Sequence, residues 1–255
     1  SGDFYTQTKS TEKNILIYIF LFLFFFSSKA QDITFYASGK SQLFASTIMN
    51  PSISDDDNQS YSFALSGSGG LGGAFYLFDK IGLSFDILYG NHKAKYKGKE
   101  FSIEGNELNF QSEISFKSIH IPILLSLLTH SDKKDNLGSG YFEIGPQFNN
   151  CMSPFYTRSD APSQGISEFC RSTYWSGILG FGMLNSLGRR TGFDYTLGLR
   201  IEYGFKDLGS VNSFGVPFNS INASKSLVLG IGLQFGIIYQ LPIATNNSYL
   251  RFLRN

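Results

Sequence analysis

The feature that most constrains this chain is a strict two-residue alternation of side chains near its C-terminal end. In residues 227–240, every odd position carries a large apolar or aromatic side chain, whereas most even positions carry glycine or glutamine. Because successive side chains of a β-strand point to opposite faces, this pattern predicts a strand with one wholly apolar face. Such a face either covers the core of a soluble sheet or faces lipid, with small and polar side chains then lining the lumen of a membrane barrel.

The same alternation recurs along the chain in segments of strand length. Residues 81–89, 175–183 and 197–205 also place large apolar side chains at most odd positions, with charges excluded from that face. No stretch after residue 30 reaches the roughly 18 apolar residues of a membrane helix. The expected strands are residues 33–45, 62–78, 81–97, 112–129, 139–152, 173–187, 192–206 and 224–240.

The connections between these segments alternate in length. Short connections lie at 79–80, 130–138 and 188–191, and long, polar ones lie at 46–61, 98–111, 153–172 and 207–223. Outer-membrane barrels combine short periplasmic turns with long outer loops and an even number of strands. We therefore predict an all-β, eight-stranded antiparallel transmembrane β-barrel in the outer membrane of a Gram-negative bacterium, with periplasmic termini. A soluble exported barrel of the lipocalin kind is the rival, because alternation alone does not decide which face lies inside.

The fourth segment departs from strict alternation. Large apolar residues occupy the odd positions from Ile119 to Leu127, but Ile114 and Phe116 lie at even positions. A β-bulge, or a strand that protrudes above the membrane, would explain the switch. Pro122 lacks a backbone donor and should interrupt the hydrogen-bond ladder locally.

The N-terminal segment predicts export. Lys13 precedes twelve apolar residues, 15–26, and the small residue Ala30 follows shortly after them. This order is typical of a cleavable secretory signal peptide, whereas twelve helical residues span only about 18 Å of a ~30 Å bilayer core. We assign residues 1–30 to an N-terminal extension and signal peptide, 31–240 to the barrel and 241–255 to a periplasmic C-terminal tail.

Composition and charge argue against several classes of function. Only 16% of the residues are charged, and removal of residues 1–30 leaves 18 basic and 18 acidic side chains. A neutral chain has no basic field to attract nucleic acid, and the 26 phenylalanines and 14 tyrosines argue against disorder. We expect outer-membrane lipid as a partner, and neither nucleic acid nor a small-molecule substrate.

Two cysteines, Cys151 and Cys170, lie nineteen positions apart. Since an exported chain meets an oxidising compartment, we predict that they form an intrachain disulfide. In the entropy model, this bond would constrain the unfolded chain by roughly 3 kcal/mol. A catalytic thiol would want a neighbouring base, and no histidine lies near either cysteine in the sequence.

Polar side chains are expected to point into the lumen of the predicted barrel. Eight-stranded barrels have interiors that side chains just fill, so we expect a buried network in which Arg200 pairs with one or more acids. A proton or ion path, or a site at the barrel mouth, is the functional alternative. The inward-facing set includes Asp86, His120, Glu143, Gln147, Arg200, Glu202, Gln234 and Gln240.

No motif predicts catalysis, a metal site or a cofactor. Residues 67–72 match G-x-G-x-x-G but continue into an alternating strand instead of opening a helix, so these glycines are expected to let a small barrel curve or to leave room inside it. The three histidines, His92, His120 and His130, have no metal-ligand spacing. The chain also lacks a G-x-S-x-G elbow.

Two neighbouring strands resemble the PorT-like outer-membrane β-barrel family. Residues 118–125 (SIHIPILL) and 140–146 (GYFEIGP) are similar to the hydrophobic-x-IP-LL and Y-x-x-x-GP pair of that family, and residues 180–182 and 199–204 are similar to its closing strands. The likeness spans roughly residues 60–240. It implies an eight-stranded barrel; the best-known member serves a type IX secretion system, and the family supplies no catalytic residues.

These observations predict a non-enzymatic structural or accessory component, associated with a type IX-like secretion or surface-assembly complex. A small transport or gating barrel is the second hypothesis. An outer-membrane hydrolase is a distant third, with His120 and either Glu143 or Asp86 as the candidates. The segments 54–58 and 93–100 carry opposite charges, which indicates a solvated outer face or a contact with divalent ions or lipopolysaccharide.

Overall fold

The computed structural model describes residues 33–49, 57–77, 80–129, 138–167, 171–187, 192–205, 208 and 227–241. These residues form ten β-strands. Within them, no helix is long and apolar enough to cross a membrane. The predicted signal peptide, the predicted C-terminal tail beyond Leu241, His130 and Cys170 lie outside the described residues.

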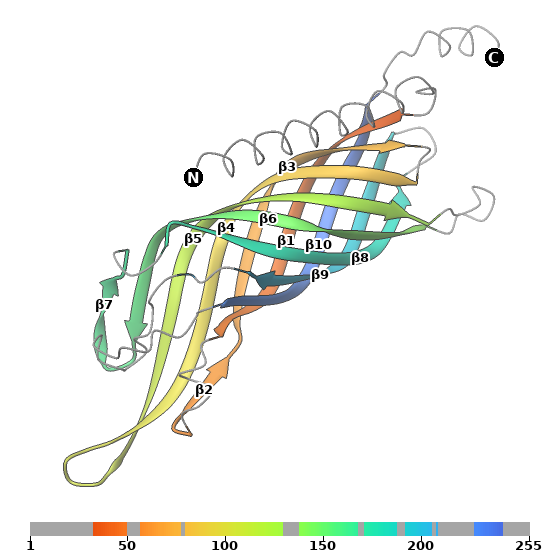
Figure 1. Ribbon diagram of the computed structural model, residues 1–255. Coiled ribbons are helices and arrows are strands. Elements are labelled where there is room, and N and C mark those ends of the chain that lie inside the picture. Colours follow the sequence, from red (N-terminus) through yellow and green to blue (C-terminus); the bar gives the residue numbers. More distant parts are fainter. Residues whose placement is uncertain are drawn as a thin grey trace, which may run out of the picture.

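Eight of the strands close into a ring, in which every strand pairs antiparallel with two neighbours (Figure 1). β1 and β10 join the two ends of the sheet. Two short strands lie off the ring: β2 (Gln59–Ser62) pairs with β4, and β7 (Ala161–Gly165) pairs with β6. In ring order, the eight strands are β1 (Ile33–Met49), β3 (Ala64–Leu77), β4 (Ile81–Phe101), β5 (Glu107–Leu128), β6 (Ser139–Arg158), β8 (Thr173–Ser186), β9 (Phe193–Gly204) and β10 (Leu227–Leu241).

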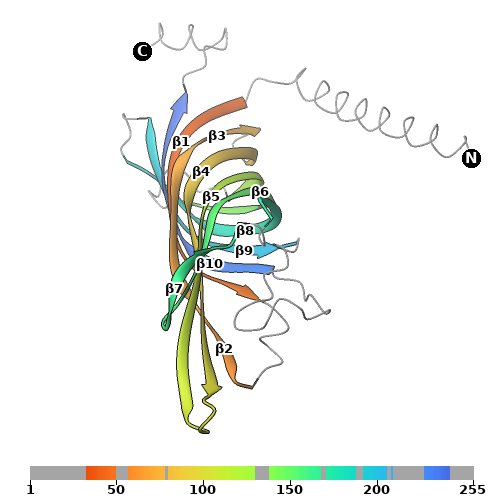
Figure 2. The same ribbon diagram turned by 90° about the vertical axis from the view of Figure 1, so that its left-hand side faces the viewer.

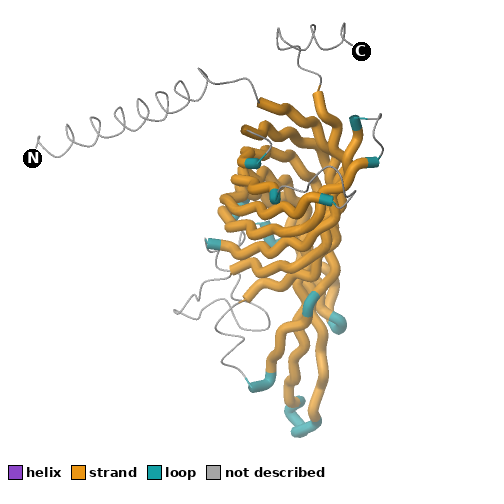
Figure 3. Tube along the Cα trace, turned by 90° about the vertical axis from the view of Figure 1, so that its right-hand side faces the viewer, coloured by secondary structure: helices purple, strands orange, loops and turns teal. Residues whose placement is uncertain are grey.

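The eight predicted segments are confirmed, but four ring strands are longer than expected, and β1 runs on from the predicted end at residue 45 to Met49. β4 ends at Phe101 and β5 begins at Glu107, so only residues 102–106 remain of the long loop predicted at 98–111. β6 likewise runs on to Arg158, within a segment predicted as loop. With β2 and β7, the added parts of β4, β5 and β6 project beyond the rest of the ring as a sheet (Figures 2 and 3). We call this part, residues 59–62, 91–117 and 151–165, the extension.

The alternation of side chains separates an outer face from a lumen. At the odd positions from Ile81 to Tyr89 of β4, the side chains are 40–53% exposed, while the even positions are buried. Large exposed apolar side chains recur on all eight ring strands, and buried serine, asparagine and charged residues lie inside. This inverts the arrangement of a soluble barrel, so the lipocalin-like rival is wrong. The outer face is the lipid-facing surface of a transmembrane barrel.

The predicted irregularity near Ile114 and Phe116 arises because β5 protrudes beyond the lipid-facing band, and not from a bulge in β5 itself. Both side chains are buried and share the parity of His120, so the strand does not switch faces. The extension instead has an apolar inner side. A register shift opposite Ser115 and Lys117 does place a bulge here, but on β6, where Ser153 has a φ of 47°.

Pro122 interrupts the ladder between β4 and β5 as predicted. Pairing holds as far as Phe85 opposite Ile123 and resumes at Leu88 opposite His120, in an unchanged register. The missing pairs include the position of Pro122, because proline has no backbone N–H to donate. The break is therefore local and leaves the barrel closed.

We predict that the depth of an introduced charge decides its cost. Leu233→Arg, in the middle of the lipid-facing positions of β10, should lower the free energy of unfolding by about 2–4 kcal/mol, while Leu241→Arg at the end of that strand should cost about 0–1 kcal/mol. Urea unfolding in lipid vesicles, followed by the mobility of the folded barrel on unheated gels, would measure both. Equal costs at the two positions would contradict a membrane midplane near Leu233.

Candidate functional site

The lumen holds the polar side chains that the sequence pointed to. Seven of them are buried, with exposed fractions of 0–8%. The eighth, Gln240, is exposed near the end of β10, so the expectation that it belongs to a buried network is wrong. The strand there reaches the rim of the barrel, where no lumen remains to face. The seven buried residues are Asp86, His120, Glu143, Gln147, Arg200, Glu202 and Gln234.

Ion pairs cross the half of the lumen nearer the short turns. Lys40 Nζ lies 2.8 Å from Asp86 Oδ2 and 4.0 Å from Glu143 Oε1. Arg200 Nη2 lies 3.6 Å from Glu143 Oε2, as expected for its pairing with an acid. Both Arg200 and Glu202 line a cavity of about 260 Å³, including the part open to solvent. Sequence reasoning missed Lys40. Its parity on β1 was the available signal, but that strand has small residues on its outer face (Ala37, Gly39 and Ser41), so the two faces were hard to tell apart.

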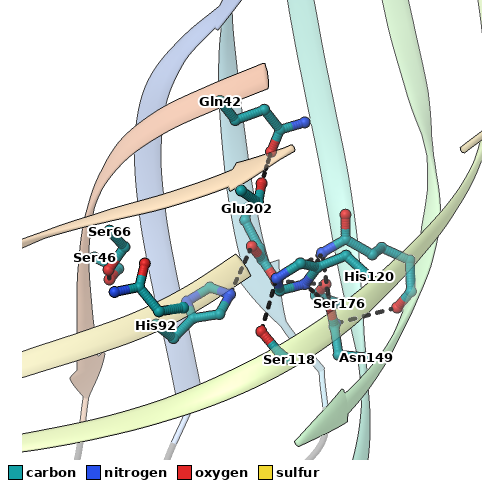
Figure 4. A network of polar contacts seen from close by, with 12 residues as sticks. Gln42, Ser46, Ser66, His92, Ser118, His120, Asn149, Ser176 and Glu202 are labelled. Atoms are coloured by element: carbon teal, nitrogen blue, oxygen red, sulfur yellow. Dashed lines mark hydrogen bonds and ion pairs between the residues drawn. The ribbon is translucent and has the colours of Figure 1, made fainter. Parts of the chain in front are cut away.

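The other half of the lumen is organised by a directional chain of hydrogen bonds (Figure 4). Asn149 Nδ2 donates to Ser176 Oγ at 2.9 Å, which donates to Glu202 Oε1 at 2.8 Å. Asn149 Oδ1 must then accept from His120 Nδ1, at 2.6 Å, and this leaves His120 Nε2 to accept from Ser118 Oγ at 2.8 Å. Each group thus donates a hydrogen bond to the next, from the Ser118 hydroxyl to the Glu202 carboxylate.

This chain explains how a buried carboxylate is tolerated. A charge in the barrel interior is costly unless hydrogen bonds and counter-charges replace its water. Glu202 also accepts from Gln147 Nε2 at 3.1 Å, and His92 Nε2 lies 3.9 Å from its second oxygen. Linked donors polarise one another, so the network should be stronger than its separate bonds.

The arrangement of Ser118, His120 and Asn149 has the bond pattern of a nucleophile, a base and an orienting group. The predicted partners of His120, Glu143 and Asp86, are not its partners: both belong to the ion-pair half of the lumen. Ser118 is fully buried and lines neither lumen cavity. The hydrogen bonds that run from Ser118 end at the Glu202 carboxylate, which they support.

The two described histidines meet in the lumen, although the sequence separates them widely. The His92 and His120 rings have centroids 4.8 Å apart, and His92 also stacks on Phe116 at 5.3 Å. Among the residues that the structure places, no three potential ligands are grouped around a metal position. The contact is an aromatic one within the packed lumen.

The two ends of the lumen differ. At the short-turn end, a cavity of about 510 Å³, including the part open to solvent, lies above the ion pairs and is lined by Tyr36, Tyr76 and Tyr141. At the long-loop end, a buried apolar cluster covers the polar network. The cluster consists of Ile48, Ala94, Tyr96, Ile114, Phe116, Cys151, Ile166, Tyr174, Leu208 and Val228.

Groups of the extension outside the lipid-facing band are held by burial and ion pairs. Burial raises the pKa of Tyr96 well above its usual value, and its hydroxyl donates to the Ile48 carbonyl at 2.9 Å. Arg158 lies 4.1 Å from the Phe110 ring centroid. Its hydrogen bond to Glu100, at 2.6 Å, raises the pKa of the guanidinium.

The predicted disulfide is not tested, because Cys170 lies outside the described residues. Cys151 is buried in the apolar cluster. Its backbone N–H donates to the carbonyl of Ser172 at 2.6 Å, so a residue two positions after Cys170 lies beside Cys151.

Glycine makes room for the ion pairs, as the interpretation of residues 67–72 expected. A Cβ at Gly72 would collide with the carboxylate of Asp86 and the backbone of Phe85. The neighbouring Gly73 faces outward, where a Cβ would lie 3.3 Å from the Tyr36 carbonyl oxygen. Residue 72 must therefore lack a side chain for Asp86 to reach Lys40.

A closed antiparallel ring with a lipid-facing band and a filled polar lumen defines a small outer-membrane β-barrel. The outer membrane protein beta-barrel domain family matches residues 30–210, and the chain belongs to this family. It is therefore a protein of the outer membrane of Gram-negative bacteria.

Solved structures of outer-membrane proteins are similar to this chain at low identity. Neisserial surface protein A is 12% identical with a TM-score of 0.44, covering 83% of this chain and 100% of its own. OprG from Pseudomonas aeruginosa is 13% identical with a TM-score of 0.41, covering 82% and 95%. AlkL, solved in lipid bilayers, is 17% identical with a TM-score of 0.38, covering 83% and 92%. No curated protein matches the sequence.

We predict that removing the charge of Lys40 alone destabilises the barrel more than removing the charges of Lys40 and Asp86 together. Lys40→Met would leave a buried carboxylate without its counter-charge and should lower the free energy of unfolding by up to about 3 kcal/mol. The low end of the usual range applies because Lys40 lines the solvent-open cavity. The double variant Lys40→Met/Asp86→Asn, with no charge left unpaired, should regain most of the loss in the same urea titration.

The exposed Lys80, in a turn, provides the control. Lys80→Met removes a lysine of equal charge and should leave the unfolding midpoint unchanged. If Lys40→Met were as stable as Lys80→Met, solvent in the cavity would already neutralise Asp86.

Proposed function

We propose that this chain is a non-enzymatic accessory barrel that anchors a protein-docking sheet at the cell surface, as part of a secretion or surface-assembly complex. Its termini then lie in the periplasm, and the extension lies outside the cell. The observation that carries the proposal is the extension, a sheet that leaves the membrane while the lumen beneath it is filled.

The filled lumen favours anchoring over transport. Ion pairs, a hydrogen-bond chain and an apolar cluster follow one another along the barrel axis, and an eight-stranded ring is only wide enough for side chains. A small transport or gating barrel remains the second hypothesis, supported by the charged groups inside. Conductance steps in planar bilayers that vanish in an Arg200→Gln variant would favour the transport hypothesis over the anchoring one.

The tip of the extension favours a protein partner. Phe101, Ile103 and Leu108 surround the turn between β4 and β5 and are 65%, 108% and 55% exposed. Large apolar side chains grouped on a surface outside the membrane typically mark an interaction site. The resemblance to the PorT-like family adds support for a type IX-like complex as the setting.

We predict that the apolar tip is needed for association but not for folding. The triple variant Phe101→Ser/Ile103→Ser/Leu108→Ser should fold normally, because these side chains are solvent-exposed. It should lose the proteins that co-purify with the tagged parent from native outer membranes in mild detergent, as identified by mass spectrometry.

Leu187→Ser provides a matched control, since Leu187 is 53% exposed at the other end of the barrel. It should retain every partner. Recovery of the parent chain alone, or of the same partners with the triple variant, would count against the docking function.

We predict that Ser118 is not a nucleophile. A fluorophosphonate reagent should leave Ser118 unlabelled in the folded barrel, because its hydroxyl is buried and donates to His120. Peptide mass spectrometry after labelling would measure this. Stoichiometric labelling that His120→Ala abolishes would restore the hydrolase hypothesis.

A further inference from the structure

One face of the extension continues the lipid-facing side of β4 beyond the apolar band. The outward positions of this strand change from large apolar residues, ending at Tyr89, to Asn91 and then to a run of lysines. Alternate residues of a strand share a face, so the lysines line up above the lipid-facing side chains. This lysine column consists of Lys93, Lys95, Lys97 and Lys99.

Strand β5 adds a fifth lysine at the root of the column. Lys117 lies opposite Asn91, which makes Lys117 and Lys93 diagonal neighbours on one face of an antiparallel pair. Diagonal neighbours are roughly 7–8 Å apart. Two lysine side chains at that separation can both reach one phosphate group.

The acidic side chains on this face neutralise only part of its positive charge. Within the described residues, two carboxylates of β5 form ion pairs with the column, while Lys97 and Lys117 form none. Five lysines and two glutamates leave three uncompensated positive charges, so the surface is complementary to anions. The ion pairs are Lys93–Glu113 at 3.2 Å, Lys95–Glu113 at 3.5 Å and Lys99–Glu107 at 2.7 Å.

We propose that the root of the column, formed by Lys93, Lys95 and Lys117, binds the phosphate groups of a phosphorylated glycolipid in the outer leaflet. The side chains of Lys93 and Lys95 are 36% and 50% exposed, so a headgroup can reach them. Tyr89 marks the edge of the apolar band, where aromatic side chains meet lipid headgroups. The root therefore lies at headgroup height.

The same lipid contacts two kinds of surface. Its phosphates meet the lysines, while its acyl chains lie against the apolar side chains of β4 just below, such as Ile87 and Phe85, which are 52% and 46% exposed. A soluble anion would use only the lysines. Continuity of the two surfaces is the reason for assigning a lipid. The inference rests on the proposed orientation of the barrel but not on the proposed protein partners.

Native mass spectrometry of the detergent-solubilised protein, titrated with diphosphorylated lipid A, tests this assignment. The parent should bind lipid A more tightly than its dephosphorylated form. Because a lysine near a lipid surface contributes about a fivefold effect on association, Lys93→Gln/Lys117→Gln should weaken binding by about tenfold or more. The matched variant Lys97→Gln/Lys99→Gln removes the same charge farther from the band and should change binding by less than about threefold.

Three results would overturn the assignment. Equal weakening by the two variants would indicate a diffuse field in place of a site. Equal binding of the dephosphorylated lipid, or displacement of lipid A by an equal concentration of inorganic phosphate, would remove the phosphorylated lipid as the ligand. Lysine-dependent binding of phosphatidylglycerol without binding of lipid A would overturn both the glycolipid and the orientation, and would leave the test of the protein partners unaffected.

Discussion

The absence of water from the bilayer interior determines most of this structure. Each unpaired backbone N–H or C=O group in lipid costs several kcal/mol, so a sheet can span the membrane only if it has no edge. The ladder between β1 and β10, from Phe35 opposite Leu241 to Met49 opposite Leu227, removes the two edges that a linear sheet would keep. Closure with eight strands in turn sets the width of the lumen, which side chains must then fill.

The narrow lumen is filled partly by charged side chains, and each of these buried charges requires a counter-charge or hydrogen bonds. Lys40 compensates Asp86 directly, whereas Glu202 is stabilised by neutral donors arranged in one direction. Gly72 is part of the same solution, because only a residue without a side chain leaves space for Asp86. The polar lumen thus plays the role that an apolar core plays in a soluble protein.

Beyond the bilayer, water surrounds the strands in place of lipid, and the extension has the opposite arrangement of apolar and polar side chains. Its inner side carries the apolar cluster around Tyr96 and Phe116, and its outer side carries lysines. The same strands therefore pass from an apolar-out to an apolar-in arrangement without a change in parity. Beyond Tyr89 the outward positions no longer show the lipid-facing pattern, so the sequence did not reveal that β4 runs on to Phe101 and that β5 begins at Glu107.

The sequence alone determined the strand positions within the membrane, the eight-stranded ring and the direction in which most side chains point. It could do so because lipid acts on every second residue of every strand, and this local demand is visible as a period of two. Only the tertiary structure decided which lumen residues meet. Lys40 and Asp86 are 46 positions apart, and Gln42 and Gln234, whose side chains lie 3.2 Å apart, are separated by 192. Such contacts depend on the register between strands and on closure of the ring, which no local pattern of residues encodes.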